Sequence, residues 1–222
     1  GEGCSYTAHL MGVDLLSRRS IFISHPHLDH VGGLGNLLWN IRKLDGLSGD
    51  RLEGEEIEVY MPNMDTWDGL MQLLRNTEGN FKCSFDIKAS RITDGVIYKK
   101  DGFKVTALHN LHMSKTEDGK WQSFSFLIEA EGKRIVYSGD IKSMKDIASL
   151  IDSCDLLLIE TGHHKVEDIC YYIKHNKKNV RNLGFIHHGR AILQKPDYEL
   201  EKAKEILGGD VLITEDGTTI EM

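Results

Sequence analysis

The segment Ser24–His30, SHPHLDH, places three histidines and one aspartate within seven residues. His25 and His27 alternate and can point the same way, whereas Asp29 and His30 come after the chain turns. Imidazole and carboxylate donors without thiolate suit zinc, and also manganese or iron. One such loop can therefore supply ligands to two metal ions about 3.5–4 Å apart, an arrangement that activates water. With equally frequent residue types, H-x-H-x-D-H arises by chance in about one chain in a thousand of this length.

Further candidate ligands follow apolar strands elsewhere in the chain. They are His109 and His112, Asp140, Glu160 with His163 and His164, and His187 with His188. Proteins of the α/β class place ligand sites at the carboxyl ends of strands, so these side chains are expected on one rim with the first cluster. Within a doublet at a strand end, the two side chains face opposite ways, and only one of them should point at a metal ion.

The elements that must position these residues are predicted from hydrophobic periodicity and turn signals. Helices are expected at 34–44, 65–75, 166–177 and 198–207, and strands at 20–24, 56–61, 103–108, 155–159 and 183–186. Glu131-Gly132 and Asp216-Gly217 each predict the turn of a hairpin, the second within 211–221. Mixed sheets between helices, an α/β class, fit this order better than a barrel or a bundle.

Composition excludes several classes of protein. The chain has 222 residues, enough for a substantial core, and a formal net charge of −7 that argues against broad, non-specific binding of nucleic acid. No apolar run approaches the roughly 20 residues that span a bilayer, and no signal-peptide pattern occurs, so we expect a cytoplasmic protein. The four cysteines form no CxxC pair and are expected to be buried, reduced thiols.

The motif at residues 25–30 resembles the signature of the metallo-β-lactamase superfamily. The other motifs follow in the family's order, with His112 ending VTALHNLH, Asp140 ending YSGD and His187 ending FIH. The form IVYSGD, with Glu160 on the next strand, is most similar to the ribonuclease Z and phosphodiesterase branch. The resemblance covers nearly the whole chain. It implies one domain over residues 1–222 with an αββα sandwich of two mixed sheets between helices.

The resemblance also implies a set of ligands. His25, His27 and His112 would hold the first metal ion, Asp29, His30 and His187 the second, and Asp140 would bridge both. His109 is the rival of His112, which has the family's distance from Val105. His188 is the rival of His187 for the last position.

The sequence departs from the family pattern in three places. The chain starts at the turn Gly1-Glu2-Gly3, so the first sheet is expected to lack the N-terminal strands that the family has. The long basic arm with which ribonuclease Z clamps transfer RNA is not visible. Of the active-site His-Glu pair, Glu160 is present, but Ile159 stands in the place of the histidine.

The predicted activity is that of a dinuclear metal-dependent hydrolase that uses a metal-bridging hydroxide. Metal can lower the pKa of water from about 15.7 to about 7, about 12 kcal/mol in hydroxide availability, far more than a histidine base contributes. With the hydroxide and two carboxylates, Asp29 and Asp140, the cluster carries about +1 and favours an anion, such as a small or single-stranded phosphodiester. Both carboxylates are expected to act in catalysis. A thioesterase, a lactonase and a non-catalytic metal-binding protein are the alternatives; the sequence leaves a homodimer open.

The segment Glu160–His164, ETGHH, keeps one carboxylate and two histidines after the ligands are assigned. It is either a solvated loop with one helix-capping histidine or part of the catalytic apparatus. In the second interpretation, His163 or His164 protonates the leaving group and Glu160 orients an imidazole.

Overall fold

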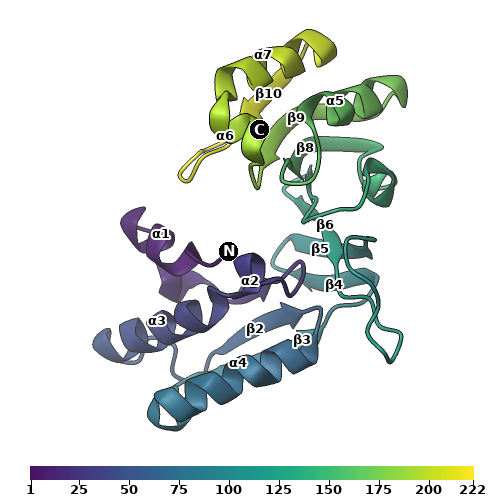
Figure 1. Ribbon diagram of the computed structural model, residues 1–222. Helices are drawn as coiled ribbons and strands as arrows, with labels where there is room; N and C mark the ends of the chain where they lie inside the picture. Colours follow the sequence, from purple (N-terminus) through teal and green to yellow (C-terminus); the bar gives the residue numbers. More distant parts are fainter. The chain divides into compact units, whose positions relative to one another are not determined.

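The computed structural model describes all of residues 1–222 and consists of two compact units, Gly1–Ile92 and Thr93–Met222 (Figure 1). Each unit has its own sheet and its own cluster of buried apolar side chains. None of the helices combines the length and the apolarity that crossing a membrane requires. The sequence-based prediction that the whole chain acts as a single hydrolase domain stays a prediction.

The first unit is built on a parallel three-stranded sheet in the order β1-β2-β3. Its strands are β1 (Ser20–Phe22), β2 (Glu56–Met61) and β3 (Asp86–Arg91), and its helices are α1 (Cys4–Leu10), α2 (Leu28–Val31), α3 (Leu34–Leu47) and α4 (Met64–Thr77). Short 3₁₀ turns occupy Leu15–Ser17 and Gly79–Phe81. Parallel neighbours need crossover connections, and α3 and α4 supply them, so these two helices run along the sheet (Figure 1).

Local sequence explains where these two helices form. In α3, the buried side chains of Leu34, Leu38 and Ile41 recur at helical spacing and pack into the core of the first unit. Helix α4 begins after Asn63, whose side chain accepts hydrogen bonds from the backbone N–H groups of Asp65 and Thr66. Both predicted helices are confirmed, and each extends a few residues beyond the predicted bounds.

The second unit is built on a mixed seven-stranded sheet in the order β10-β9-β8-β7-β6-β5-β4. Its strands are β4 (Gly95–Lys100), β5 (Phe103–His109), β6 (Phe124–Ala130), β7 (Lys133–Tyr137), β8 (Ser153–Glu160), β9 (Asn179–Ile186) and β10 (Asp210–Ile213). Its helices are α5 (Val166–His175), α6 (Arg190–Gln194) and α7 (Pro196–Leu207), with a 3₁₀ turn at Met144–Ile147. Figure 1 shows the three helices beside β8, β9 and β10.

The direction of the strands in this sheet determines which edge can hold ligands. Strand β6 pairs antiparallel with both β5 and β7, while β8 pairs parallel with β7 and with β9. Strands β5, β7, β8 and β9 therefore all run the same way, and their carboxyl ends meet at one edge. The predicted hairpin between β6 and β7 is confirmed, with φ of 51° at Glu131 and 75° at Gly132, the positive values that a tight hairpin turn requires.

Apolar faces hold the helices to this sheet. In α5, Val166, Ile169, Cys170 and Ile173 are buried in the core of the unit, and the helix packs against α7. Desolvation of the buried thiol raises the pKa of Cys170 to about 12, so it stays protonated. All four cysteines are free, as expected, although Cys4 and Cys83 are only partly buried.

The predicted C-terminal hairpin is wrong. Strand β10 pairs parallel with β9 instead of folding back on itself, and no strand follows it. Residues 215–219 are exposed, so a return strand would have no apolar side to bury. The turn at Asp216-Gly217 is instead closed by a hydrogen bond from the backbone N–H of Glu215 to the hydroxyl of Thr218 (2.8 Å).

Candidate metal centre

The loop after β1 gathers the first cluster within the first unit. His25 is fully buried, and its Nδ1 lies 3.2 Å from the hydroxyl of Ser24. Its ring centroid lies 4.7 Å from that of His27 and 3.9 Å from that of His30. Asp29 is on the first turn of α2, with Oδ2 3.2 Å from Nε2 of His30. The structure thus brings all four predicted donors of this loop together.

The second cluster lies at the carboxyl ends of the parallel strands of the second unit, around Asp140. This carboxylate follows β7 and is only 2 % exposed. Oδ2 lies 3.8 Å from Nε2 of His112 and 3.5 Å from Nδ1 of His163, and Oδ1 lies 3.9 Å from Nδ1 of His187. These separations exceed the 2.7–3.2 Å typical of a direct hydrogen bond.

The donors around Asp140 fit a divalent metal ion. Ligands about 2.0–2.1 Å from a tetrahedral zinc ion lie about 3.3 Å from one another. Donor atoms of His112, Asp140 and His163 all lie within 4.8 Å of one another, as do those of Glu160, His163 and His187. Neutral imidazoles beside one buried carboxylate are the donors that zinc, manganese and iron accept. The sequence did not assign His163 as a ligand, but its position makes that role geometrically accessible.

The geometry favours His112 over His109 as the metal ligand. His109 is the last residue of β5, and its Nδ1 lies 2.7 Å from Oδ2 of Asp94. Its ring also stacks on Trp121, with centroids 4.2 Å apart. Both contacts give His109 a structural role away from Asp140, whereas His112 faces that carboxylate.

The geometry favours His187 over His188 in the same way. Nε2 of His188 donates to the backbone carbonyl of Thr214 at 2.6 Å, which fixes that ring against the segment after β10. His187 instead faces Asp140, in a left-handed backbone conformation with φ of 45°. Such a conformation is uncommon for a residue other than glycine and often marks a functional site.

The two histidines that follow Glu160, His163 and His164, differ in their contacts and in their exposure. Its buried carboxylate accepts a hydrogen bond from the backbone N–H of His163 at 2.8 Å. Nδ1 of His163 lies 3.4 Å from Oε1 of Glu160, and the side chain of His163 is 48 % exposed. Nε2 of His164 donates to the backbone carbonyl of Ile141 at 3.0 Å, and its side chain is only 17 % exposed. Of the two imidazoles, that of His163 is therefore the more accessible, whereas that of His164 is tied to the backbone of Ile141.

Sequence reasoning missed the buried hydrogen bonds that position two of the donors. The side chain of Asn110 accepts from the backbone N–H of His112 (3.1 Å) and donates to the hydroxyl of Ser125 (3.1 Å). That hydroxyl donates to the carbonyl of Ser138, two residues before Asp140. Asn110, Ser125 and Ser138 are all buried. Their spacing follows no sequence motif, because the three residues come from three different strand ends.

Replacement of Ser125 by alanine should lower the free energy of unfolding by about 1–3 kcal/mol, because buried groups of Asn110 and Ser138 would lose their partner. Urea denaturation of the purified protein measures this. Ser114→Ala is the matched control, since Ser114 is exposed, and should change stability by less than about 0.5 kcal/mol. Equal stability of Ser125→Ala and the control would show that the network does not hold the strand ends.

Gly162 is a second position that the sequence did not identify. A Cβ atom there would come within 2.5 Å of Nδ1 of His187. Any side chain would therefore displace the imidazole that faces Asp140. The glycine within ETGHH is thus explained by the close approach of the two loops.

The two units have sheets covered by helices, and imidazoles and carboxylates gather after their strands; this combination defines a metal-dependent hydrolase of the metallo-β-lactamase fold. The family model described as "Beta-lactamase superfamily domain" matches residues 13–189. The chain belongs to this β-lactamase superfamily.

Curated relatives and solved structures agree with this assignment. The chain is 22 % identical to ribonuclease Z of Archaeoglobus fulgidus, covering 100 % of this chain and 86 % of the relative. It is 24 % identical to ribonuclease Z of Picrophilus torridus, covering 97 % and 82 %. Its fold is similar to that of the metallo-β-lactamase fold protein YhfI of Bacillus subtilis, with a TM-score of 0.71, 18 % identity and coverage of 95 % and 81 %. Human tRNase Z, short form, gives a TM-score of 0.68, 17 % identity and coverage of 100 % and 85 %.

These similarities confirm the fold class and the resemblance that the sequence motifs predicted. The order of motifs, the strand ends and the fold of known relatives lead to the same family. Membership implies divalent metal ions at the donor clusters. The individual ligand assignments stay predictions.

Proposed function

We propose that this protein is a dinuclear metal-dependent phosphodiesterase similar to ribonuclease Z. The proposal keeps the ligands implied by the motif order. His25, His27 and His112 would hold one ion, Asp29, His30 and His187 would hold the other, and Asp140 would contribute to both. Zinc is the first choice of metal. When bound, such ions make hydroxide available near neutral pH. The substrate class is a small or single-stranded phosphodiester.

The observation that carries the proposal is the arrangement around Asp140. Three imidazole nitrogens lie 3.5–3.9 Å from a carboxylate that is almost completely buried. Burying a charged carboxylate costs free energy unless cations neutralise it. A purely structural aspartate would not require three imidazoles to face it. The curated relatives named ribonuclease Z support a phosphodiester substrate.

The residues of the second unit also suggest where a leaving group would lie. A hollow of about 310 Å³ is lined by His112, His163 and His164 together with Leu111, Ile141 and Lys142. In the proposed reaction, water adds its oxygen to phosphorus, the bond to the leaving oxygen breaks, and that oxygen takes a proton. His163 would hold that proton, because it faces both the hollow and Asp140. Lys142 would hold a non-reacting phosphate oxygen.

The proposal is tested by loading the purified protein with zinc and offering it bis(p-nitrophenyl) phosphate. We expect about two ions per chain by elemental analysis, release of p-nitrophenolate, and loss of activity after chelation that zinc restores. A glutathione thioester and a γ-lactone, tested in parallel, should be poor substrates.

Each other outcome has a definite meaning. Hydrolysis of the thioester or the lactone without the phosphodiester would establish the alternative of a thioesterase or lactonase. Two bound ions without turnover of any substrate would indicate a metal-binding protein that is not an enzyme. Absence of bound metal after loading would overturn the assignment of the centre itself.

A further inference from the structure

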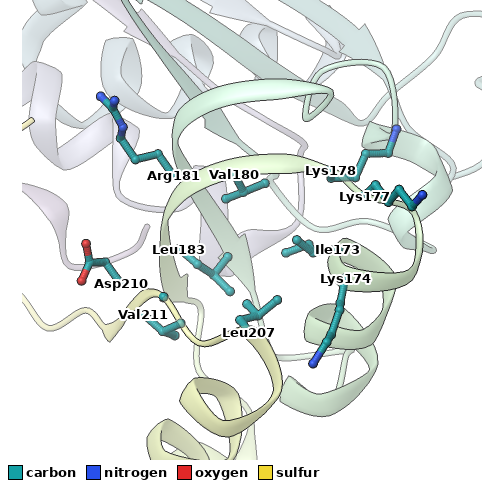
Figure 2. Close-up of a pocket in the computed structure, with 11 residues that line it drawn as sticks. Ile173, Lys174, Lys177, Lys178, Val180, Arg181, Leu183, Leu207, Asp210 and Val211 are labelled. Atoms are coloured by element: carbon teal, nitrogen blue, oxygen red, sulfur yellow. The ribbon is translucent and has the colours of Figure 1, made fainter.

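A second hollow lies in the second unit, at the amino ends of β9 and β10, the edge of the sheet opposite to Asp140. It has a volume of about 210 Å³ and is enclosed by the last turns of α5 and α7 and by the two strands (Figure 2). Its floor consists of aliphatic side chains, namely Ile173, Val180, Leu183, Leu207 and Val211. Three of them, Ile173, Leu183 and Val211, are at most 6 % exposed and belong to the core. An apolar floor of this kind favours an apolar ligand body.

The rim of this hollow carries more basic than acidic side chains, although the chain has a net charge of −7. It carries Lys174, Lys177, Lys178 and Arg181, and one carboxylate, Asp210, is in its lining. Two of the cations have carboxylate partners just outside the lining, because Lys178 pairs with Asp152 and Arg181 lies 3.5 Å from Asp155. Figure 2 shows the three lysines on one side of the hollow, and Arg181 and Asp210 on the other side. Lys174 and Lys177 are therefore the rim cations without a carboxylate partner, and both lie on the lysine side.

Two of the three lysines bind backbone carbonyl groups, and the third does not. The ammonium of Lys174 donates to the carbonyl of Ile206 (2.6 Å), in the last turn of α7, and that of Lys178 donates to the carbonyl of Ala148 (3.0 Å). Such contacts are typical of lysines that stabilise chain ends. Lys177 makes no side-chain contact of this kind and is exposed at the rim, with its backbone in the left-handed region (φ 51°) directly after α5.

We propose that this hollow binds a small amphipathic anion, with a carboxylate or phosphate head at Lys177 and an apolar body on the aliphatic floor. The volume corresponds to about seven water molecules, enough for a short aliphatic chain. A nucleic acid fits less well, because the floor offers no aromatic ring on which a base could stack. The proposal is independent of the activity assigned to the metal centre.

Three six-carbon probes test the head and the body separately: hexanoate, hexylammonium and hexanol. Titration of the ¹⁵N-labelled, full-length protein should give hexanoate shifts confined to the ends of α5 and α7 and the starts of β9 and β10. Hexanoate should bind with a dissociation constant of about 1 mM, at least about tenfold more tightly than either other probe. Lys177→Gln should weaken hexanoate binding about fivefold or more, and Lys177→Arg should retain it.

A second pair of variants tests the cavity itself. A Cβ atom at Gly209, which lines the hollow, meets no heavy atom within 4 Å, so Gly209→Leu should fold and fill the space. It should abolish hexanoate binding. Gly69→Leu in α4 is the matched control, because a Cβ atom there also meets nothing within 4 Å, and it should bind like the parent. Melting temperatures confirm that both variants are folded.

Three results would overturn the proposal. They are equal affinity for hexanoate and hexylammonium, unchanged binding in Gly209→Leu, and shifts that lie elsewhere in the chain. Tighter binding of a hexauridylate than of hexanoate at these residues, unaffected by Gly209→Leu, would assign the basic rim to nucleic acid instead.

Discussion

Asp140→Asn should reduce phosphodiester hydrolysis by at least about 100-fold while leaving the fold intact. Asparagine keeps the shape of the side chain but removes the negative charge that three imidazoles surround at 3.5–3.9 Å. Loss of that charge weakens metal binding and the electrostatic organisation of the site, and single losses of either kind cost about 10–1,000-fold. Initial rates on bis(p-nitrophenyl) phosphate, with elemental analysis of the same samples, measure both effects.

The matched control for this variant is Asp101→Asn. Asp101 is an exposed residue in the turn between β4 and β5, with φ of 51°, where asparagine is well tolerated. This control should keep full activity and full metal content. If Asp140→Asn keeps the activity and the metal occupancy of the parent protein, the assignment of Asp140 to the metal centre is wrong.

His163→Ala should slow hydrolysis of a poor leaving group by about 100-fold or more, and affect a good leaving group far less. A positioned proton donor typically contributes about 10²–10⁴-fold when the departing oxygen needs a proton. Thymidylyl-(3′→5′)-thymidine has such a leaving group, whereas p-nitrophenolate departs without protonation. The measurement is the ratio of kcat values for the two substrates in the parent protein and in the variant.

Two further variants separate this role from other effects of histidine loss. His164→Ala should reduce both rates alike, because the ring of His164 holds the carbonyl of Ile141. His175→Ala, at the exposed end of α5, should change neither rate. If His163→Ala lowers metal content and both rates together, His163 is a metal ligand, and the proton-donor role is wrong.

Periodicity and motif spacing predicted the parts of the fold that are encoded locally. Strand β2 matches its predicted bounds of 56–61, because alternation ends at Pro62. The hairpin at Glu131-Gly132 is confirmed for a similar reason, since its turn chemistry is specific to two residues. The C-terminal hairpin failed because Asp216-Gly217 gives the same local signal without a second apolar strand to pair, and only tertiary packing distinguishes the two cases.

The candidate site shows the same division. Residue types and order selected candidate donors that the structure brings together in two clusters, because metal chemistry restricts which side chains can serve. The choice between neighbours depends on hydrogen bonds that the sequence cannot reveal, such as the contact of His188 with Thr214 and of His109 with Asp94. The supporting roles of Ser125 and Gly162 depend on residues far apart in the chain that approach one another only in the folded sheet.

The parallel course of β5, β7, β8 and β9 also determines where the protein can be engineered. All donors of the second unit follow the carboxyl ends of these strands, so connections at the opposite edge are about one strand length, roughly 15–25 Å, from the chemistry. The tight turn at Glu131-Gly132 lies at that opposite edge and is exposed. A fluorescent label, a purification tag or new chain termini created by circular permutation belong at this turn, where the backbone can be opened without disturbing a metal ligand.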